Sequence, residues 1–259
     1  MAAAGAARRA RMTDARRAYD AWHRALEVER PDDALSPWHE AAIPYVGDLT
    51  GRVVLEIACG RGVFARWLAG RGARCIAFAD YSPAAVALGD RDGAPRAPEG
   101  GFLAGDIERL PFADATFDLI CSFETLEHVP SPSAGLAELV RVTKPGGRLI
   151  ITTPNYIGLL GLYRAFRNLT GRPYAETGQP INQPVTLIGR VRALRALGCR
   201  VDVIDGFGHY LYLPGRRPRR MFALDRVRAI TRWFGAHSLT VATRGAGGAG
   251  GAGGAGGAG

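Results

Sequence analysis

The chain has 259 residues and is 47% apolar, which is enough for the core of one α/β domain with insertions. Its net charge is +9, but Lys144 is the one lysine among many arginines, so we ascribe the excess to base composition and do not expect nucleic acid as the partner. The arginine clusters suit a solvated surface or, alternatively, an anionic partner. No apolar run reaches the roughly 18 residues that span a bilayer, and no apolar leader segment follows the N-terminal arginines, so secretion is not expected. The four cysteines lack CxxC pairing and metal-ligand spacing, which predicts a reducing cytoplasm and no metal site.

Low-complexity ends flank the predicted domain. Residues 1–12 are rich in Ala and Arg, and 245–259 contain only Gly and Ala, so we expect both ends to be disordered. A single domain over 13–244 remains. We divide it into N-terminal lid helices (13–50), a core (51–155), an insertion (156–184) and a second insertion (208–236).

Apolar runs alternate with helical patterns from Arg52 onward, which is typical of βα units around a parallel sheet. We predict a Rossmann-like, doubly wound and mostly parallel sheet with a final antiparallel strand. The predicted strands are 52–59, 74–80, 100–106, 116–124, 148–154, 200–207 and 238–244. The predicted helices follow Gly62, begin at Ser82 and Pro83, and span 131–143 and 186–197.

The turn GRGVFA after the first strand lets the backbone approach a ligand closely. It formally matches G-x-G-x-x-G/A, a dinucleotide fingerprint, but the same turn also occurs where no ligand binds. Three acids near the predicted strand ends help to distinguish a ligand-binding turn from one without a ligand. Glu56 interrupts an apolar strand and needs a partner, for which a cationic ligand group would serve. Asp80 ends the second strand, where a carboxylate binds ribose hydroxyls, and Asp106 with Ile107 at the third suits an adenine.

Four ordered motifs give the chain its resemblance to a known family. They are VLEIACGRG, FADYS, GDIERLPFADATFDLICSFETLEHV and LVRVTKPGGRLIITTPN. Together they resemble the class I S-adenosylmethionine-dependent methyltransferases, in the branch that includes quinone-biosynthesis and other small-molecule enzymes. The resemblance covers about 53–155 and weakens through 185–207.

The resemblance implies a cofactor site for S-adenosyl-L-methionine. The loop around its methionine part would be formed by Glu56, Ala58, Cys59, Gly60 and Gly62. Asp80 would hold the ribose, with Tyr81 beside the adenine, which Asp106 and Ile107 would bind. Phe123 and Glu124 would line the far wall of the site, after the fourth strand. The family usually has Gly where this chain has Ala58, so the loop is expected to lie slightly farther from the ligand.

Two histidines are candidates for a general base, which methyl transfer to oxygen or nitrogen can require. His128, in LEHVP after the fourth strand, lies where the methyl group is expected, although a wall residue would have the same position. His209, in GFGHYLYLP, is a second candidate, with a satisfied loop residue as its alternative.

The two insertions are more apolar than surface loops usually are. YIGLLGLYRAF (156–166) suits a substrate-pocket wall, which we prefer, or else a dimer face or a lipid-facing patch. Arg219–Phe234 has the pattern of a basic amphipathic helix, which either packs on the domain or contacts a membrane surface peripherally. The oligomeric state cannot be predicted from these patterns.

The sequence therefore predicts an S-adenosylmethionine-dependent methyltransferase that acts on a small molecule, with the acceptor and the methylated atom open. Two alternatives are a nicotinamide-dependent oxidoreductase using GRGVFA and Asp80, and a non-catalytic cofactor-binding partner subunit. The lack of a Tyr-x-x-x-Lys pair counts against the short-chain type of oxidoreductase.

Overall fold

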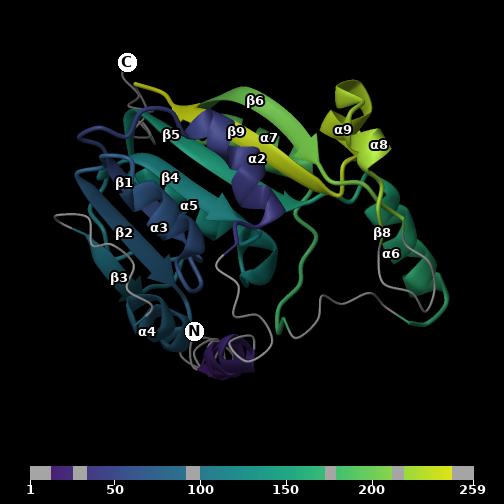
Figure 1. Cartoon of the computed structure of the whole chain (residues 1–259), viewed down its shortest axis with the longest axis horizontal. Coiled ribbons are helices and arrows are strands. Elements are labelled where there is room, and N and C mark those ends of the chain that lie inside the picture. The colour runs from purple at the N-terminus through teal and green to yellow at the C-terminus, as the bar shows by residue number, and fades with distance from the viewer. Residues whose placement is uncertain (1–12, 26–33, 92–99, 173–178, 212–218, 247–259) are drawn as a thin grey trace, which may run out of the picture.

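The computed structural model describes residues 13–25, 34–91, 100–172, 179–211 and 219–246. Of the ends predicted to be disordered, 1–12 and all of 245–259 except its first two residues lie outside these ranges. Seven strands form one sheet in the order β3-β2-β1-β4-β5-β9-β6 (Figure 1). Neighbours from β3 to β5 are parallel, whereas β9 is antiparallel to β5 and β6. The strands are β1 (Val53–Ile57), β2 (Cys75–Asp80), β3 (Gly101–Ala104), β4 (Phe117–Phe123), β5 (Thr143–Pro154), β6 (Cys199–Phe207) and β9 (His237–Arg244). The predicted fold class is confirmed.

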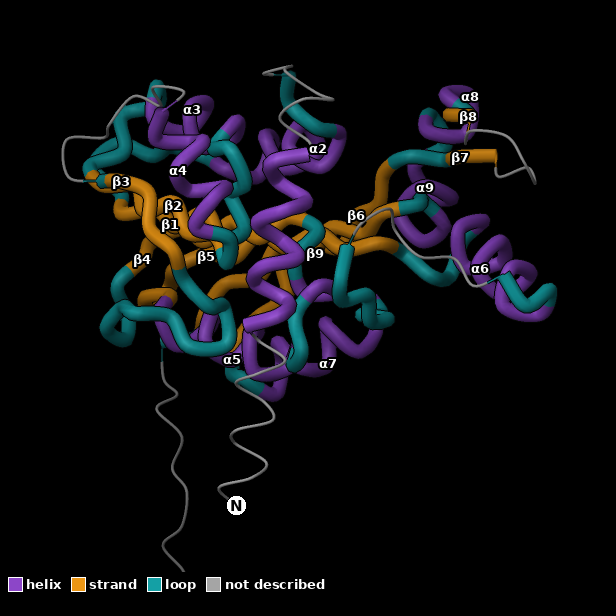
Figure 2. The backbone as a smooth tube through the Cα atoms, turned by 90° about the horizontal axis from the view of Figure 1, so that it is seen from below, coloured by secondary structure: helices purple, strands orange, loops and turns teal. Residues whose placement is uncertain are grey.

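Helices cover both faces of the sheet (Figure 2). One face carries α2 (Pro37–Val46), α3 (Val63–Ala69) and α4 (Pro83–Arg91), and the other carries α5 (Pro132–Val142) and α7 (Leu187–Ala196). Because both faces are covered, the central strand β1 is buried along its whole length, which is why its sequence is a continuous apolar run broken only by one acid.

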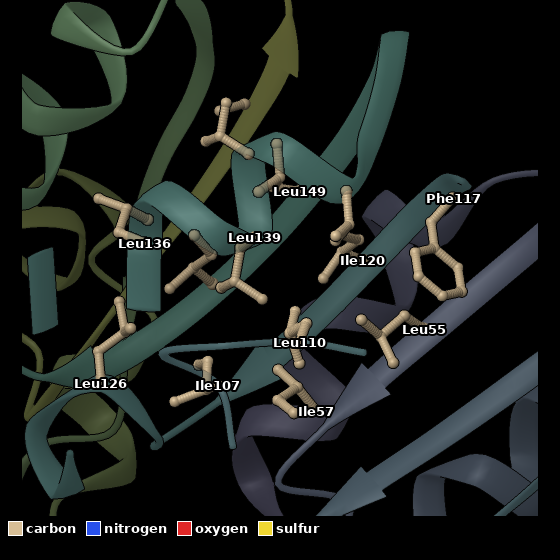
Figure 3. Close-up of a cluster of buried hydrophobic side chains, with 14 of the residues drawn as sticks. Leu55, Ile57, Ile107, Leu110, Phe117, Ile120, Leu126, Leu136, Leu139 and Leu149 are labelled. Carbon is tan, nitrogen blue, oxygen red and sulfur yellow. The ribbon is translucent and has the colours of Figure 1, made fainter. Parts of the chain in front are cut away.

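The core lies in two layers, one on each side of the sheet, because successive strand residues point to opposite faces. Figure 3 shows the layer under α5, where Leu55 and Ile57 of β1 and Ile120 of β4 meet Leu139 of α5 and Leu149 of β5. Val54, the residue before Leu55, belongs to the opposite layer under α2 and α3. This packing fixes the strand ends that carry the candidate site.

Several predicted boundaries differ from the structure. The third strand ends at Ala104, so Asp106 lies in the turn that follows it. Thr143 already pairs with Phe117 on β4, so β5 begins five residues before the predicted start at Arg148. The predicted final strand, β9, lies between β5 and β6.

The basic segment Arg219–Phe234 is not one helix, as its pattern predicted. Its first two residues form β8 (Arg219–Arg220), which pairs with β7 (Tyr210–Leu211). Two short helices follow, α8 (Phe222–Asp225) and α9 (Arg228–Phe234). The non-helical backbone of Val227, at φ −89° and ψ 83°, separates them.

The inserted segments form a lobe at one end of the sheet. It comprises the described residues 156–172, 208–211 and 219–236, which include α6 (Leu159–Leu169), and we call it the insertion lobe. Figures 1 and 2 show it beyond β6, away from β2 and β3. None of the described helices combines the length and the hydropathy needed to cross a bilayer.

Candidate functional site

The turn after β1 has left-handed backbone at three positions. Ala58, Gly60 and Gly62 have φ values of 56°, 53° and 72°. Left-handed backbone costs about 1 kcal/mol or more for a residue with a Cβ, so glycine is favoured at such positions and Ala58 is strained. Cys59 between them is buried, and burial raises the pKa of its thiol well above the usual range. The strained residue therefore lies at the predicted cofactor loop.

Replacing Gly62 with alanine should lower the free energy of unfolding by about 3 kcal/mol, because strain and crowding add. A Cβ at this position would lie 2.5 Å from Cζ of Phe102. Gly146→Ala is the matched control: its φ is +76°, and nothing lies within 4 Å of its Cβ position, so only about 1 kcal/mol of strain is expected. Urea unfolding of both variants measures the difference, and equal losses would contradict the crowding at Gly62.

Glu56 is buried within β1, with only 2% of its surface exposed. Its neighbours on the sheet are Phe78 of β2 and Cys121 of β4. Burial, with a smaller contribution from the charge of Asp80, raises the pKa of the Glu56 carboxyl to about 8. Oε2 of this carboxyl has no hydrogen-bond partner among the described residues. A buried acceptor of this kind fits a cationic or hydrogen-bond-donating ligand group.

Asp80 ends β2, and its carboxylate is held by the neighbouring backbone. Oδ2 accepts a hydrogen bond from the Gly60 amide at 2.9 Å, and Oδ1 accepts one from the Ser82 amide at 2.8 Å. Burial is the largest influence on the Asp80 carboxyl and raises its pKa. The glycine turn and the acid therefore form one hydrogen-bonded unit at the tips of β1 and β2.

An N-terminal helix over 13–25 lies against the end of β2. Oδ1 of Asp20 accepts hydrogen bonds from the Ser82 hydroxyl at 2.5 Å and from the Ala84 amide at 3.1 Å, at the start of α4. Nε2 of His23, on the same helix, lies 3.8 Å from Oδ1 of Asp80. Burial lowers the pKa of His23 and the charge of Asp80 opposes this change. The first predicted lid helix thus closes over the acid expected to bind ribose.

Asp106 and Ile107 follow β3, the strand next to β2. Ala104 pairs with Asp80 in the parallel register, and the Gly105 amide donates to the Asp80 carbonyl at 2.9 Å. Ile107 is buried, whereas Asp106 is half-buried and its Oδ1 accepts from the Glu108 amide at 2.9 Å. The two acids that the sequence assigned to ribose and adenine therefore lie at neighbouring strand ends.

Tyr81, the residue after Asp80, lies under the N-terminal helix. Nε of Arg16 donates to the Tyr81 carbonyl at 3.0 Å, and the Arg16 guanidinium lies 5.4 Å from the centre of the Tyr81 ring. Tyr19 meets the same ring edge-on, with ring centres 6.1 Å apart. Tyr81 is thus packed between the helix and the β2 end, beside the predicted adenine pocket.

The end of β4 carries a paired carboxylate that sequence analysis did not identify as a pair. Glu124 has left-handed backbone, at φ 47°, and its Oε2 lies 2.9 Å from Nδ1 of His237, the first residue of β9. Oε1 of Glu124 has no hydrogen-bond partner among the described residues. His237 stacks on Phe207, with ring centres 5.1 Å apart, and Trp38 of α2 lies at 6.1 Å. This arrangement combines an ionisable pair with an aromatic wall.

The two predicted base candidates have different environments. Nδ1 of His128 donates to the carbonyl of Ile181 at 2.8 Å, so the neutral ring carries its basic lone pair on Nε2, which lies 3.7 Å from Glu127. His209 is buried in the insertion lobe, with its Nδ1 3.0 Å from Oδ1 of Asp225. That pairing gives His209 a role in holding the lobe together.

A buried arginine lies behind the β4 end. Arg190 of α7 is 2% exposed and donates to hydroxyl groups on β5 and β9, those of Thr153, Ser238 and Thr240. Burial lowers the pKa of its guanidinium to about 10, and the charges of Glu124 and Glu127 act in the opposite direction. Arg190 therefore supplies positive charge to a region with one buried acid, Glu127, and one half-buried acid, Glu124. Arg190 is one of three arginines in α7, so the sequence gave no signal that set it apart for this role.

Comparison with known proteins agrees with this geometry. The family described as "Methyltransferase domain" matches residues 55–151. A demethylmenaquinone methyltransferase of Mycolicibacterium paratuberculosis is 37% identical over 176 residues, which are 66% of this chain and 73% of the relative. One from Beutenbergia cavernae is 37% identical over 142 residues, 54% of this chain and 57% of the relative. The chain thus spans little more than half of that second relative.

A solved structure shares the fold. It is the complex between the Haloferax volcanii Trm112 methyltransferase activator and a methyltransferase described as putative. The TM-score is 0.62 with 21% sequence identity, over 90% of this chain and 96% of the other. At this identity the likeness concerns the fold alone.

Proposed function

Because the chain belongs to the class I S-adenosylmethionine-dependent methyltransferases, in the quinone-biosynthesis-like branch, we propose that it transfers a methyl group from S-adenosylmethionine to a small-molecule acceptor. Bound S-adenosylmethionine supplies the methyl carbon already activated as an electrophile. The protein's task is then mostly to bind and orient the two reactants and to exclude water.

One observation carries this proposal: three acids lie at or near the carboxyl ends of the adjacent strands β1, β2 and β3. Glu56 is the last residue but one of β1, Asp80 ends β2 beside the left-handed glycine turn, and Asp106 lies in the turn after β3. In this proposal the unpartnered Oε2 of Glu56 accepts a hydrogen bond from the amino group of the methionine part, and the Asp80 carboxylate binds the ribose hydroxyls. Asp106 and Ile107 hold the adenine. The turn at Ala58, Cys59, Gly60 and Gly62 encloses the methionine part, and Tyr81, Phe123 and Glu124 complete the walls.

The family membership favours this function over the nicotinamide-dependent alternative. A calorimetric titration decides between them, with S-adenosylhomocysteine and NAD added in parallel to the full chain. We expect heat from S-adenosylhomocysteine and none from NAD. The reverse result would overturn the proposal. Binding of S-adenosylhomocysteine without any turnover would instead support the non-catalytic partner subunit.

For the acceptor we propose a hydrophobic ring compound held against the aromatic wall around His237. Phe207, Trp38 and Tyr210 lie around this histidine, with ring centres between 5.1 and 6.5 Å from it. The names of the relatives make demethylmenaquinone the first compound to test, under conditions that keep it reduced.

We assign the general base to His128, whose orientation is fixed by its hydrogen bond to Ile181. His128→Ala should lower turnover by about 100-fold and leave S-adenosylhomocysteine affinity unchanged, because a base acts on the acceptor. His237→Ala is the comparison, since this ring is also next to an acid. Turnover with demethylmenaquinone measures both. If only His237→Ala loses activity, the base is the Glu124–His237 pair and the assignment to His128 is wrong.

The proposed location is the cytoplasm, with peripheral contact to a membrane surface. Free, buried thiols at Cys59, Cys121 and Cys199 support a reducing compartment. An acceptor with a lipid tail would be found at a membrane surface. The part of the protein that suits this contact is the insertion lobe.

A further inference from the structure

The exposed large apolar side chains of this protein are concentrated in one region. Among the described residues, all twelve lie between 157 and 234, and all but Ile188 belong to the insertion lobe. Single exposed apolar residues are normal, but a contiguous group marks an interaction surface. The eleven lobe residues are Ile157, Leu159, Leu162, Phe166, Leu169, Leu211, Phe222, Val227, Ile230, Trp233 and Phe234.

Helix α6 presents an apolar stripe away from the protein. Leu159, Leu162, Phe166 and Leu169 are spaced by three and four residues, so at roughly 100° per residue they share one face. Leu162 is 68% exposed and Leu169 is 88% exposed. Leu160, on a different face, is the one buried residue of the helix. The stripe therefore contributes nothing to the core.

Helices α8 and α9 are also largely exposed to solvent. No residue of α8 is buried, and Thr231 is the one buried residue of α9. The segment lies next to α6, because a Cβ on Gly158, the residue before α6, would lie 2.1 Å from the Phe234 carbonyl oxygen. The exposed apolar residues of both insertions thus belong to one end of the molecule (Figure 2).

The charge of this end is strongly positive. Residues 155–172 and 219–236 contain eight arginines and a single acid, Asp225. That acid is already engaged, because its two carboxylate oxygens lie 3.0 Å from His209 and from Arg220. Arg226 and Arg232 are exposed and have no ion pair with a described residue. Apolar side chains among unneutralised arginines suit an anionic, amphipathic surface.

The lobe is tied to the acceptor side of the candidate site. It follows the carboxyl ends of β5 and β6, and it leads back into the sheet at His237. Asn155, at the end of β5, donates from Nδ2 to the Trp233 carbonyl at 2.7 Å and from its amide to the Ala236 carbonyl at 2.7 Å. Contact made by the lobe would therefore bring the aromatic wall around His237 close to whatever the lobe binds.

We propose that the insertion lobe docks on the surface of an anionic lipid bilayer, with α6, α8 and α9 inserted at the level of the headgroups. Docking presents the acceptor side of the site to the lipid phase, so that a hydrophobic acceptor enters from the bilayer. This last point rests on the proposed methyl transfer, whereas the lipid contact itself does not.

The experiment is co-sedimentation of the full chain with vesicles of phosphatidylcholine alone or with phosphatidylglycerol. We expect binding only to the anionic vesicles, and weakening as salt is added. Leu162→Glu with Phe166→Glu should abolish it, and Arg226→Glu with Arg232→Glu should weaken it by more than about 25-fold, at about fivefold for each lost arginine. Ile188→Glu, an exposed apolar position outside the lobe, and Arg74→Glu, before β2, are the matched controls and should bind normally.

Equal binding to both vesicle types, or equal losses in the lobe and control variants, would overturn the proposal. So would a dimer in analytical ultracentrifugation that Leu162→Glu with Phe166→Glu dissociates, in a chain that does not bind vesicles. Titration of each variant with S-adenosylhomocysteine separates this proposal from the previous one. Normal lipid binding without cofactor binding would refute the methyltransferase function alone.

Discussion

Asp80→Ala should weaken S-adenosylhomocysteine binding by about 1,000-fold, the largest loss that we expect from one substitution at the site. Two hydroxyl groups of a ribose donate to one carboxylate, and each charge-assisted hydrogen bond contributes about 2 kcal/mol. The Asp80 carboxylate is held in place by the amides of Gly60 and Ser82, so little ordering is needed when the ribose binds. Calorimetric titration measures the loss directly.

Two variants make the Asp80 result specific. Asp80→Asn keeps the shape and removes the charge, so it should retain part of the affinity and separate charge from packing. Asp118→Ala removes a partly buried acid from the opposite edge of the sheet, where it pairs with Lys144, and should bind normally. Thermal unfolding of each apo variant checks that the fold is intact. An Asp80→Ala affinity within threefold of wild type would remove Asp80 from the ribose role.

Much of this site follows from where strands end, and strand ends are visible in the sequence. β1 is buried on both faces, so its apolar run is continuous, and the acid within it is conspicuous at Glu56. Asp80 and Asp106 follow consecutive apolar runs of a parallel pattern, which puts them at one edge of the sheet. β3 ends two residues earlier than predicted, but Asp106 still lies beside the end of β2, because the Gly105 amide hydrogen-bonds to the Asp80 carbonyl.

The acceptor side was not predictable in the same way. Glu124 and His237 are 113 residues apart, and they meet only because β9 inserts between β5 and β6. Local pattern does not determine that position for a last strand. His23 reaches Asp80 through docking of a helix whose own sequence gives no register. The error over Arg219–Phe234 has the same cause, since pairing of β8 with β7 overrides a helical pattern.

Glu56→Gln should change the pH dependence of stability in a direction set by the raised pKa of this carboxyl. The unfolded carboxyl releases its proton near pH 4.5, whereas the folded one keeps it to about pH 8. The contribution of the Glu56 carboxyl to the free energy of unfolding is therefore complete below pH 4.5 and is lost as the pH rises to 8. At about 1.4 kcal/mol per pH unit the whole loss is at most about 5 kcal/mol, and Glu56→Gln should not show it.

Urea unfolding of apo protein at pH 6, 7, 8 and 9 measures this as the difference between wild type and Glu56→Gln. The free energy of unfolding of the wild-type chain should fall relative to that of the variant up to pH 8. Above pH 8 the difference between the two should be constant. Glu138→Gln is the control, because Arg141 lowers the pKa of the Glu138 carboxyl. The free energies of unfolding of this variant and of the wild type should therefore differ by a constant amount over this pH range, since the change that Glu56 causes occurs in both. If Glu56 pairs with the ligand amino group, binding of S-adenosylhomocysteine at pH 7 should also release a proton, which titration in two buffers detects. Parallel stability curves for wild type and Glu56→Gln would mean that Glu56 is ionised in the empty site, and no proton would then be released on binding.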